Sequence, residues 1–268
     1  MFAYFKRLLR DYFSSLLIAA IVITVCVVIF LLPTEVKDML VMRPQVFNPL
    51  TSISAMFVHN NLDHLSWNLI SFVIVIFLLH VIYRRTYEQK IFCILVLLMF
   101  TVLPILYGIL FYFLFPNIRG LGLSLVNSGL LGLSIPSVTT CFKQKVKKFN
   151  GLLFIASLFF FTLYFINLPI VFRCLSAILG FIFFAVVIYL VFLSNRDRRE
   201  SLIISSCTLG YLSIYLILIS WLFPLNIVSD GNIVDICAHY IGLCFGIASG
   251  SIIMYCNHQV KKLKGHDI

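Results

Sequence analysis

Three short polar clusters interrupt an otherwise apolar chain, at residues 59–68, 122–124 and 238–242. Among their serine, histidine and asparagine residues, Ser124, His239 and Asn68 are the central ones. A serine hydroxyl becomes a nucleophile when a neighbouring histidine takes its proton, and amide or ring N–H groups can stabilise the oxyanion that forms. The residue types therefore predict acyl-transfer chemistry that needs neither a metal nor another cofactor.

The composition indicates where this chemistry would take place. Of the 268 residues, 62% are hydrophobic and 11% are charged, which predicts several membrane spans. The net charge of +10 comes from basic residues in short clusters between apolar runs, a pattern typical of membrane topology and not of nucleic-acid binding. The cysteines occur singly, without a C-x-x-C pair, so they support neither a zinc site nor a disulfide framework.

Apolar stretches of sufficient length predict an all-α fold, a polytopic transmembrane helical bundle of about eight spans that forms one integral-membrane domain over residues 1–268. The predicted spans are about 12–32, 62–83, 91–115, 122–140, 151–168, 170–193, 202–223 and 233–256. Basic residues flank every second connection, from Lys6 and Arg7 to Lys261. By the positive-inside rule, both termini are expected in the cytoplasm, with the cell membrane as the expected location.

The three clusters are predicted to lie at a similar depth in the membrane. A helix rises about 1.5 Å per residue. Counted from the first basic residue at each cytoplasmic end, Ser124, His64 and His239 lie at about 28, 30 and 33 Å. We therefore expect these residues in the outer part of the membrane.

Small residues predict which of these helices pack together. On the span that begins near Ser124, a small residue recurs every four positions as far as Gly132. On the last span, Gly242 and Gly246 recur in the same way, one turn after His239. Small residues at this spacing let helix backbones approach closely in lipid, so the two spans are expected to bring the serine and the histidine within reach.

Each of these residues also has a purely structural interpretation. A serine in a membrane helix commonly bonds to a carbonyl one turn earlier, and a histidine near a helix end can be interfacial. Asn68 could bridge two helices, and the glycines alone indicate packing. Ser128, one turn deeper than Ser124, is a second candidate for the nucleophile.

At these motifs the sequence resembles the rhomboid family of intramembrane serine proteases. The resemblance covers less than a third of the chain and consists of three segments in the family's order. The segments are His59 with His64-Leu65 and Asn68, then Gly122-Leu123-Ser124 with Gly129-Leu130-Leu131-Gly132, and finally Asp235 with Ala238-His239, Gly242 and Gly246.

The resemblance implies a role for each matched residue. Ser124 would be the nucleophile and His239 its general base. The other matched residues would support this dyad: His64, Asn68 and the backbone N–H of Ser124 as oxyanion donors, His59 and Asp235 at the entrance or in support, and Gly132, Gly242 and Gly246 in helix packing.

The implied function is an endopeptidase that cleaves transmembrane segments of other proteins near their outer ends. Its partners would be transmembrane protein substrates and the lipid bilayer, with no nucleic acid and no metal; the sequence leaves the oligomeric state open. The chain departs from the family at Leu125, where a small residue is usual, and at Ser128, where an aromatic ring often packs on the base. It also has two spans more than a six-span core.

Two other functions stay open at this point. One is a catalytically inactive rhomboid-like protein that binds membrane proteins. The other is a small-solute transporter, which would require ionisable residues near the bilayer centre, and the spans nearly lack these.

Overall fold

The computed structural model describes residues 2–43, 46–86, 89–114, 119–146, 149–165, 168–194, 198–223, 228–229, 232–233 and 236–263. The chain forms two compact units, one of Met1–Ser134 with Cys237–Ile268 and one of Ile135–Ile236. Of the residues to which the sequence assigns chemistry, those that are described lie in the first unit. Asp235 lies outside the described residues.

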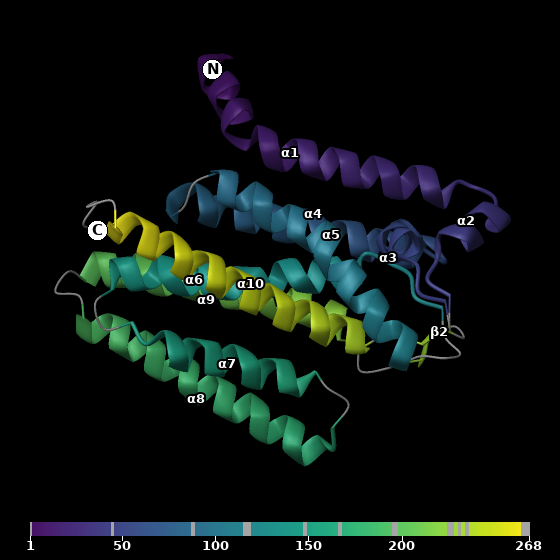
Figure 1. Cartoon of the computed structure of the whole chain (residues 1–268). Coiled ribbons are helices and arrows are strands. Elements are labelled where there is room, and N and C mark those ends of the chain that lie inside the picture. Colours follow the sequence, from purple (N-terminus) through teal and green to yellow (C-terminus); the bar gives the residue numbers. More distant parts are fainter. Residues whose placement is uncertain are drawn as a thin grey trace. The chain divides into compact units, whose positions relative to one another are not determined.

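The elements of the first unit are mostly long helices (Figure 1). They are α1 (Phe2–Phe30), α2 (Thr34–Leu40), α3 (Pro49–Ser54), the 3-10 helix η1 (Ala55–Phe57), α4 (Leu62–Thr86), α5 (Gln89–Leu114), the first part of α6 (Ser124–Lys145) and nearly all of α10 (Ile236–Leu263). The second unit contains the rest of α6 with α7 (Gly151–Tyr164), α8 (Ile170–Ser194), α9 (Arg198–Leu222), β1 (Val228–Ser229) and β2 (Asn232–Ile233).

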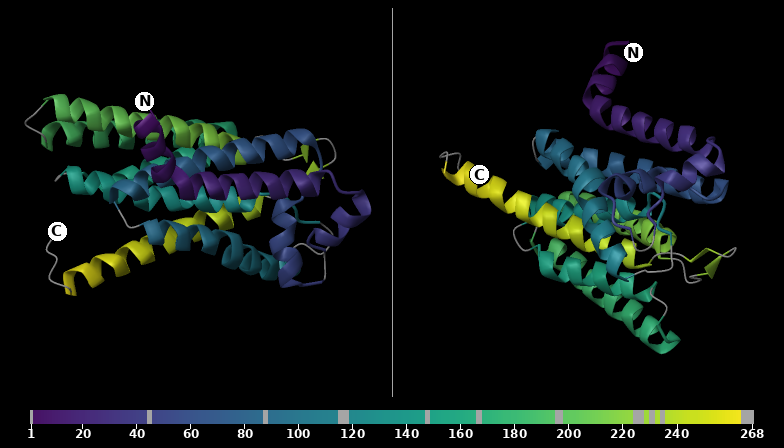
Figure 2. Two further views of the ribbon diagram at one scale, coloured as in Figure 1. Left: turned by 90° about the horizontal axis from the view of Figure 1, so that it is seen from above. Right: turned by 45° about the vertical axis from the view of Figure 1, so that its right-hand side comes forward.

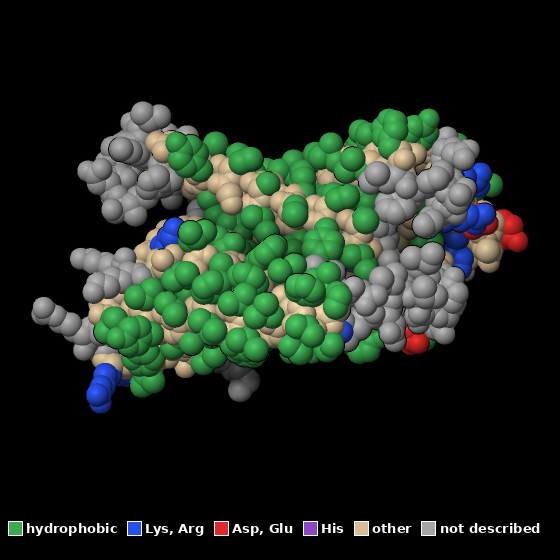
Figure 3. Space-filling model, turned by 90° about the horizontal axis from the view of Figure 1, so that it is seen from below, with side chains coloured by type: hydrophobic (Ala, Val, Ile, Leu, Met, Phe, Trp, Pro, Cys, Tyr) green, Lys and Arg blue, Asp and Glu red, His purple; other side chains and the backbone are tan. Residues whose placement is uncertain are grey.

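Length and composition of these helices confirm the predicted polytopic helical bundle. In the described part of the chain, seven helices are long and apolar enough to cross a membrane: α1, α4, α5, α6, α8, α9 and α10. The predicted span 151–168 contains α7, which has 14 residues. At about 1.5 Å per residue this helix is roughly 21 Å long, shorter than the hydrocarbon core. Hydrophobic side chains cover most of the face drawn in Figure 3, as expected for a surface in contact with lipid.

Ring contacts hold the helices of the first unit together. α1 packs on α4, and α4 packs on α5 (Figure 2). Tyr12 of α1 lies against His80 of α4, with ring centroids 4.7 Å apart. Phe72 of α4 meets Phe100 of α5 edge-on at 5.8 Å. His80 also meets Phe92 of α5 edge-on at 5.7 Å, so its ring contacts both neighbours of α4.

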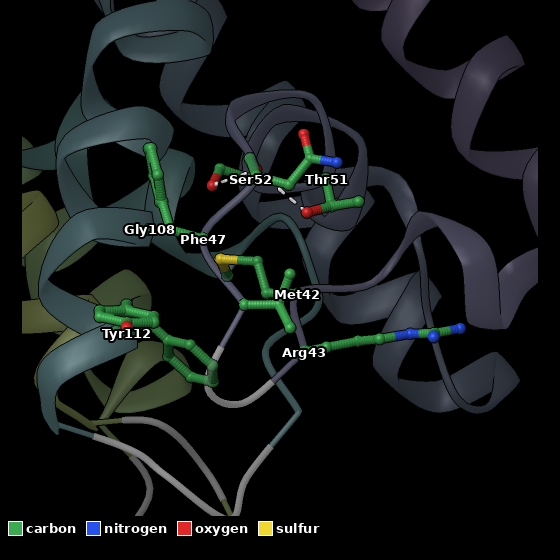
Figure 4. A pocket seen from close by; sticks show the side chains of 10 residues that line it. Met42, Arg43, Phe47, Thr51, Ser52, Gly108 and Tyr112 are labelled. Carbon is green, nitrogen blue, oxygen red and sulfur yellow. Dashed lines mark hydrogen bonds between the residues drawn. The ribbon is translucent and has the colours of Figure 1, made fainter.

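The short helix α3 rests directly on α5. A Cβ atom at Gly108 of α5 would overlap the Ser52 hydroxyl, so only glycine allows this approach. Asn48 caps α3 by accepting a hydrogen bond of 2.9 Å from the Leu50 N–H. Beside this contact lies a small pocket, to which Phe47 and Tyr112 contribute (Figure 4). The contact anchors the segment that leads to η1 and then to α4.

The second unit is organised around an aromatic cluster and a buried hydrogen bond. α7 and α8 form a packed pair (Figure 1). Phe154 of α7 lies 5.8 Å from the Tyr211 ring of α9, measured between centroids. The Thr162 and Tyr215 hydroxyls share a buried hydrogen bond of 2.7 Å. Contacts of both kinds therefore join α7 to α9.

The segment that precedes α6 is held by backbone hydrogen bonds from two places. Met42 and Gly120 exchange N–H···O bonds of 3.1 and 3.2 Å. The Gly122 N–H donates to the Ala55 carbonyl at 2.9 Å. Gly122 has a φ of 104°, in the left-handed region that favours glycine. These constraints set where α6 begins.

The backbones of α6 and α10 pass close to each other at their glycines. A Cβ at Gly242 would lie 2.5 Å from the Leu125 carbonyl oxygen and 3.1 Å from the Gly129 nitrogen. One turn further along, a Cβ at Gly246 would overlap the Gly129 carbonyl. Likewise, a Cβ at Gly132 would overlap the carbonyl oxygen of residue 243 on α10. Contacts advance along both helices in the same direction, so the two helices run parallel here.

This packing predicts opposite effects for two glycine-to-alanine changes. Gly246→Ala should destabilise the protein by about 1–3 kcal/mol, because the new methyl group meets backbone that cannot move away. Gly210→Ala on α9 is the matched control, since a Cβ there meets nothing within 4 Å. Alanine is a better helix former than glycine by roughly 0.5–1 kcal/mol, so the control should be unchanged or slightly stabilised. Thermal unfolding in detergent measures both; equal melting temperatures for the two variants would contradict the close packing.

Candidate active site

Ser124 is the first residue of α6 and is partly exposed. The first i→i−4 hydrogen bond of the helix runs from the Asn127 N–H to the Leu123 carbonyl at 3.0 Å. Backbone N–H groups in a first turn have no intrahelical acceptor, and the positive end of the helix dipole lies there. The Ser124 hydroxyl and its own N–H therefore share an environment that favours negative charge.

The start of α4 places His64 and Asn68 on one side of that helix. The Asn61 side chain accepts a 2.7 Å hydrogen bond from the His64 N–H and so caps the helix. The Asn68 amide Nδ2 donates to the His64 carbonyl at 2.9 Å. His64 is partly exposed, whereas Asn68 is buried. The predicted oxyanion donors thus lie one helical turn apart.

The segment before Ser124 lies directly against this pair. A Cβ built on Gly122 would lie 2.8 Å from both Cε1 and Nε2 of His64, and 4.0 Å from Nδ2 of Asn68. Such a distance to the ring is shorter than real Cβ contacts allow, so the sequence needs glycine here for space as well as for φ. The structure therefore brings His64 and Asn68 together beside the chain that leads into Ser124.

His239 lies in the first turn of α10 and is buried. It precedes Gly242 by one turn, about 4.5 Å of helix rise. Because Gly242 contacts α6 between Leu125 and Gly129 and the helices run parallel, His239 lies at the level of Ser124.

His59 lies behind His64 and is almost completely buried, with 1% of its surface exposed. The two imidazole rings meet edge-on, with centroids 5.0 Å apart. Nδ1 of His59 lies 3.2 Å from the Phe57 carbonyl, which fixes the proton on that nitrogen. Burial, together with the neighbouring His64, lowers the pKa of His59 from 6.5 to about 3. His59 is therefore a neutral support for the His64 ring.

The hydroxyl of Ser128, the second candidate for the nucleophile, is hydrogen-bonded within its own helix. Its hydroxyl is fully buried and lies 2.9 Å from both the Ser124 and the Leu125 carbonyl oxygens. It also occupies the position against which Gly242 packs. This is the back-bonded arrangement expected of a structural serine in a membrane helix. The geometry favours Ser124, whose hydroxyl is the more accessible.

Asn127 is a residue of this site that the motifs did not assign. It is buried on α6 and donates from Nδ2 to the Asn68 carbonyl at 2.9 Å and to the Asn68 Oδ1 at 3.3 Å. A polar amide three residues after Ser124, in a predicted membrane span, is the signal that could have found it. It links α6 to α4 at the level of the site.

No cluster of three or more His, Cys, Asp or Glu side chains that could hold a metal ion occurs among the residues described. Comparison with protein-family models, with curated proteins and with solved structures finds no match to this chain. The geometry of the residues themselves therefore carries the functional argument.

The environment of His59 predicts a pH dependence of stability. Between its folded pKa of about 3 and its ordinary pKa of 6.5, the unfolded chain binds a proton that the folded chain excludes. The contribution is complete above pH 6.5 and is lost as the pH falls, by up to about 1.4 kcal/mol per pH unit.

Thermal unfolding in detergent between pH 7.5 and 4.5 measures this loss for the native protein and for His59→Phe. The phenylalanine keeps a ring beside His64 but cannot be protonated, so its melting temperature should fall less steeply. Titration of the carboxylates affects both proteins equally and cancels in the comparison. Parallel curves would show that His59 is not held neutral by the fold.

Proposed function

We propose that the chain is an intramembrane serine endopeptidase that cleaves transmembrane segments of other proteins near their outer ends. The observation that carries the proposal is the glycine contact between α6 and α10, which brings His239 to the level of Ser124. Independent support comes from Gly122, which lies against His64 and Asn68. Nucleophile, base and oxyanion donors thus come from three separate segments of one unit.

The arrangement suits a two-step acyl transfer. His239 takes the proton of the Ser124 hydroxyl as its oxygen attacks the substrate carbonyl, and the same proton then goes to the leaving amine as the C–N bond breaks. A water molecule, deprotonated by His239, next hydrolyses the acyl-enzyme and releases Ser124. In both steps the oxyanion would accept hydrogen bonds from His64, Asn68 and the Ser124 N–H.

The N-terminal ends of three helices would stabilise the negative charge that develops in this reaction. Ser124, His64 and His239 each lie in the first turn of their helix. The N-terminal end of a helix carries a partial positive charge, which stabilises an anion near it. Three such ends support a tetrahedral oxyanion without a metal ion.

The membrane sets how a substrate would reach the site. A transmembrane segment in helical form has all its amides hydrogen-bonded internally, so it must enter between helices and unwind locally before cleavage. The charge pattern of the sequence supports cytoplasmic termini and a site at the outer side of the cell membrane.

A second function, a catalytically inactive protein that binds membrane proteins, is favoured by one observation. Ser128 stands at the position where the family often has an aromatic ring packed on the base. The experiment that follows distinguishes the two functions.

Labelling with a fluorophosphonate tests the proposal on the full-length protein in detergent or liposomes. The reagent forms a phosphorus–oxygen bond with an activated serine and releases fluoride. We expect labelling of the native protein and a loss of at least about a thousandfold in labelling rate for both Ser124→Ala and His239→Ala.

Ser128→Ala is the matched control, because it removes a hydroxyl one turn away on the same helix. It should still be labelled. Loss of labelling in Ser128→Ala with retention in Ser124→Ala would move the nucleophile to Ser128. A native protein that is neither labelled nor able to cleave a reconstituted transmembrane substrate would favour the inactive binding protein.

A further inference from the structure

Asn127 of α6 donates hydrogen bonds to Asn68 of α4, a proposed oxyanion donor. We propose that Asn127 is a positioning residue, which fixes the side-chain amide of Asn68 so that its N–H group faces the reacting carbonyl. The inference rests on the proposed function and adds a residue to which the motifs gave no role. Asn127 acts through Asn68 and does not itself contact the substrate.

Hydrogen bonding fixes the orientation of both amides. Nδ2 of Asn127 faces two acceptors, the backbone carbonyl and the Oδ1 of Asn68, at 2.9 and 3.3 Å. A flipped Asn127 would place its own oxygen against both of them, which is repulsive. Asn68 in turn must direct Oδ1 toward Asn127 and Nδ2 toward the His64 carbonyl. Each amide therefore holds the other in a single orientation.

This orientation leaves Asn68 one hydrogen to donate. An amide nitrogen carries two hydrogens, and the His64 carbonyl accepts one of them at 2.9 Å. The nitrogen lies 4.0 Å from the Cβ position of Gly122, beside the segment that leads into Ser124. Without Asn127, the bond to the His64 carbonyl alone would hold the Asn68 amide, and its second N–H could swing away from the reacting carbonyl.

The cost of burying Asn127 supports a specific role. The residue is 2% exposed, and its Oδ1 has no hydrogen-bond partner in the described part of the chain. A buried polar atom without a partner destabilises the folded state. An apolar residue of similar volume would avoid this cost and would still pack between the helices, so packing alone does not explain an asparagine here.

The helices themselves also couple the position of Ser124 to that of Asn68. Asn127 and Ser124 are three residues apart on α6, and therefore one rigid helical turn joins them. Asn68 and His64 are joined in the same way on α4. The Asn127–Asn68 hydrogen bonds connect the two turns and set the distance between the serine and its oxyanion donors.

The test is a double-mutant cycle on the full-length protein, read by fluorophosphonate labelling and by cleavage of a reconstituted transmembrane substrate. Asn127→Leu should lower kcat by about tenfold to a hundredfold, part of the effect of losing an oxyanion donor, while KM stays within about twofold. In an Asn68→Ala background the same change should have no further effect beyond about twofold, because the amide that it positions is gone.

Ser71→Ala is the matched control. Ser71 is buried on α4 one turn from Asn68, and its hydroxyl donates to the Trp67 carbonyl of its own helix at 2.8 Å. It should keep native kcat and KM. If Asn127→Leu does not fold, Asn127→Ser replaces it, because a serine hydroxyl bonds back to its own helix and does not reach Asn68.

The outcomes separate this inference from the proposed function. Native activity in Asn127→Leu, or equal losses in the presence and absence of Asn68, would overturn the positioning role and leave the protease intact. A rise in KM with unchanged kcat would overturn it as well. The absence of any Ser124-dependent labelling in the native protein would overturn the proposed function, and the role of Asn127 with it.

Discussion

The close approach of the α6 and α10 backbones is the contact on which the site depends. Lipid tails are as apolar as leucine side chains, so helices in a membrane associate through packing and hydrogen bonds and not through the hydrophobic effect. At Gly132, Gly242 and Gly246 the absence of side chains lets backbone meet backbone. Such a contact tolerates only one register, because a shift of one residue places a side chain in the gap. The register in turn fixes the level of His239 relative to Ser124.

A second set of constraints brings α4 to the same place. Gly122 lies against the His64 ring, while Asn127 donates to Asn68. The first contact is steric and the second is polar, and both are made with the turn of α4 that carries His64 and Asn68. Together they prevent α4 from rotating about its axis or sliding along α6. Polar groups are costly in a membrane, so their gathering at one crossing supports a function there.

The sequence predicted the helices well because apolar length is a direct physical signal in a membrane. It predicted less well where structure depends on distant partners. The length of α7 is one example, since residues 151–168 are apolar throughout while the helix ends at Tyr164. The Met42–Gly120 bridge is another, because residues far apart in sequence exchange hydrogen bonds that no local pattern indicates. For the site, spacing predicted the glycine contact between α6 and α10, whereas the roles of the histidines stay predictions. The partnership of Asn127 with Asn68 was not predictable, because it depends on how two helices are rotated toward each other.

His59 stays neutral because its ring is buried beside His64. Its ring is buried against His64, and its one hydrogen bond is to the Phe57 carbonyl. A protonated His59 would have no carboxylate beside it among the described contacts. Its positive charge would also repel a proton on His64. Keeping His59 uncharged therefore leaves the His64 ring free to interact with negative charge on its other side. In the proposed reaction that negative charge is the oxyanion. His59 is buried and does not touch the substrate, but its neutral state favours binding of the oxyanion by His64.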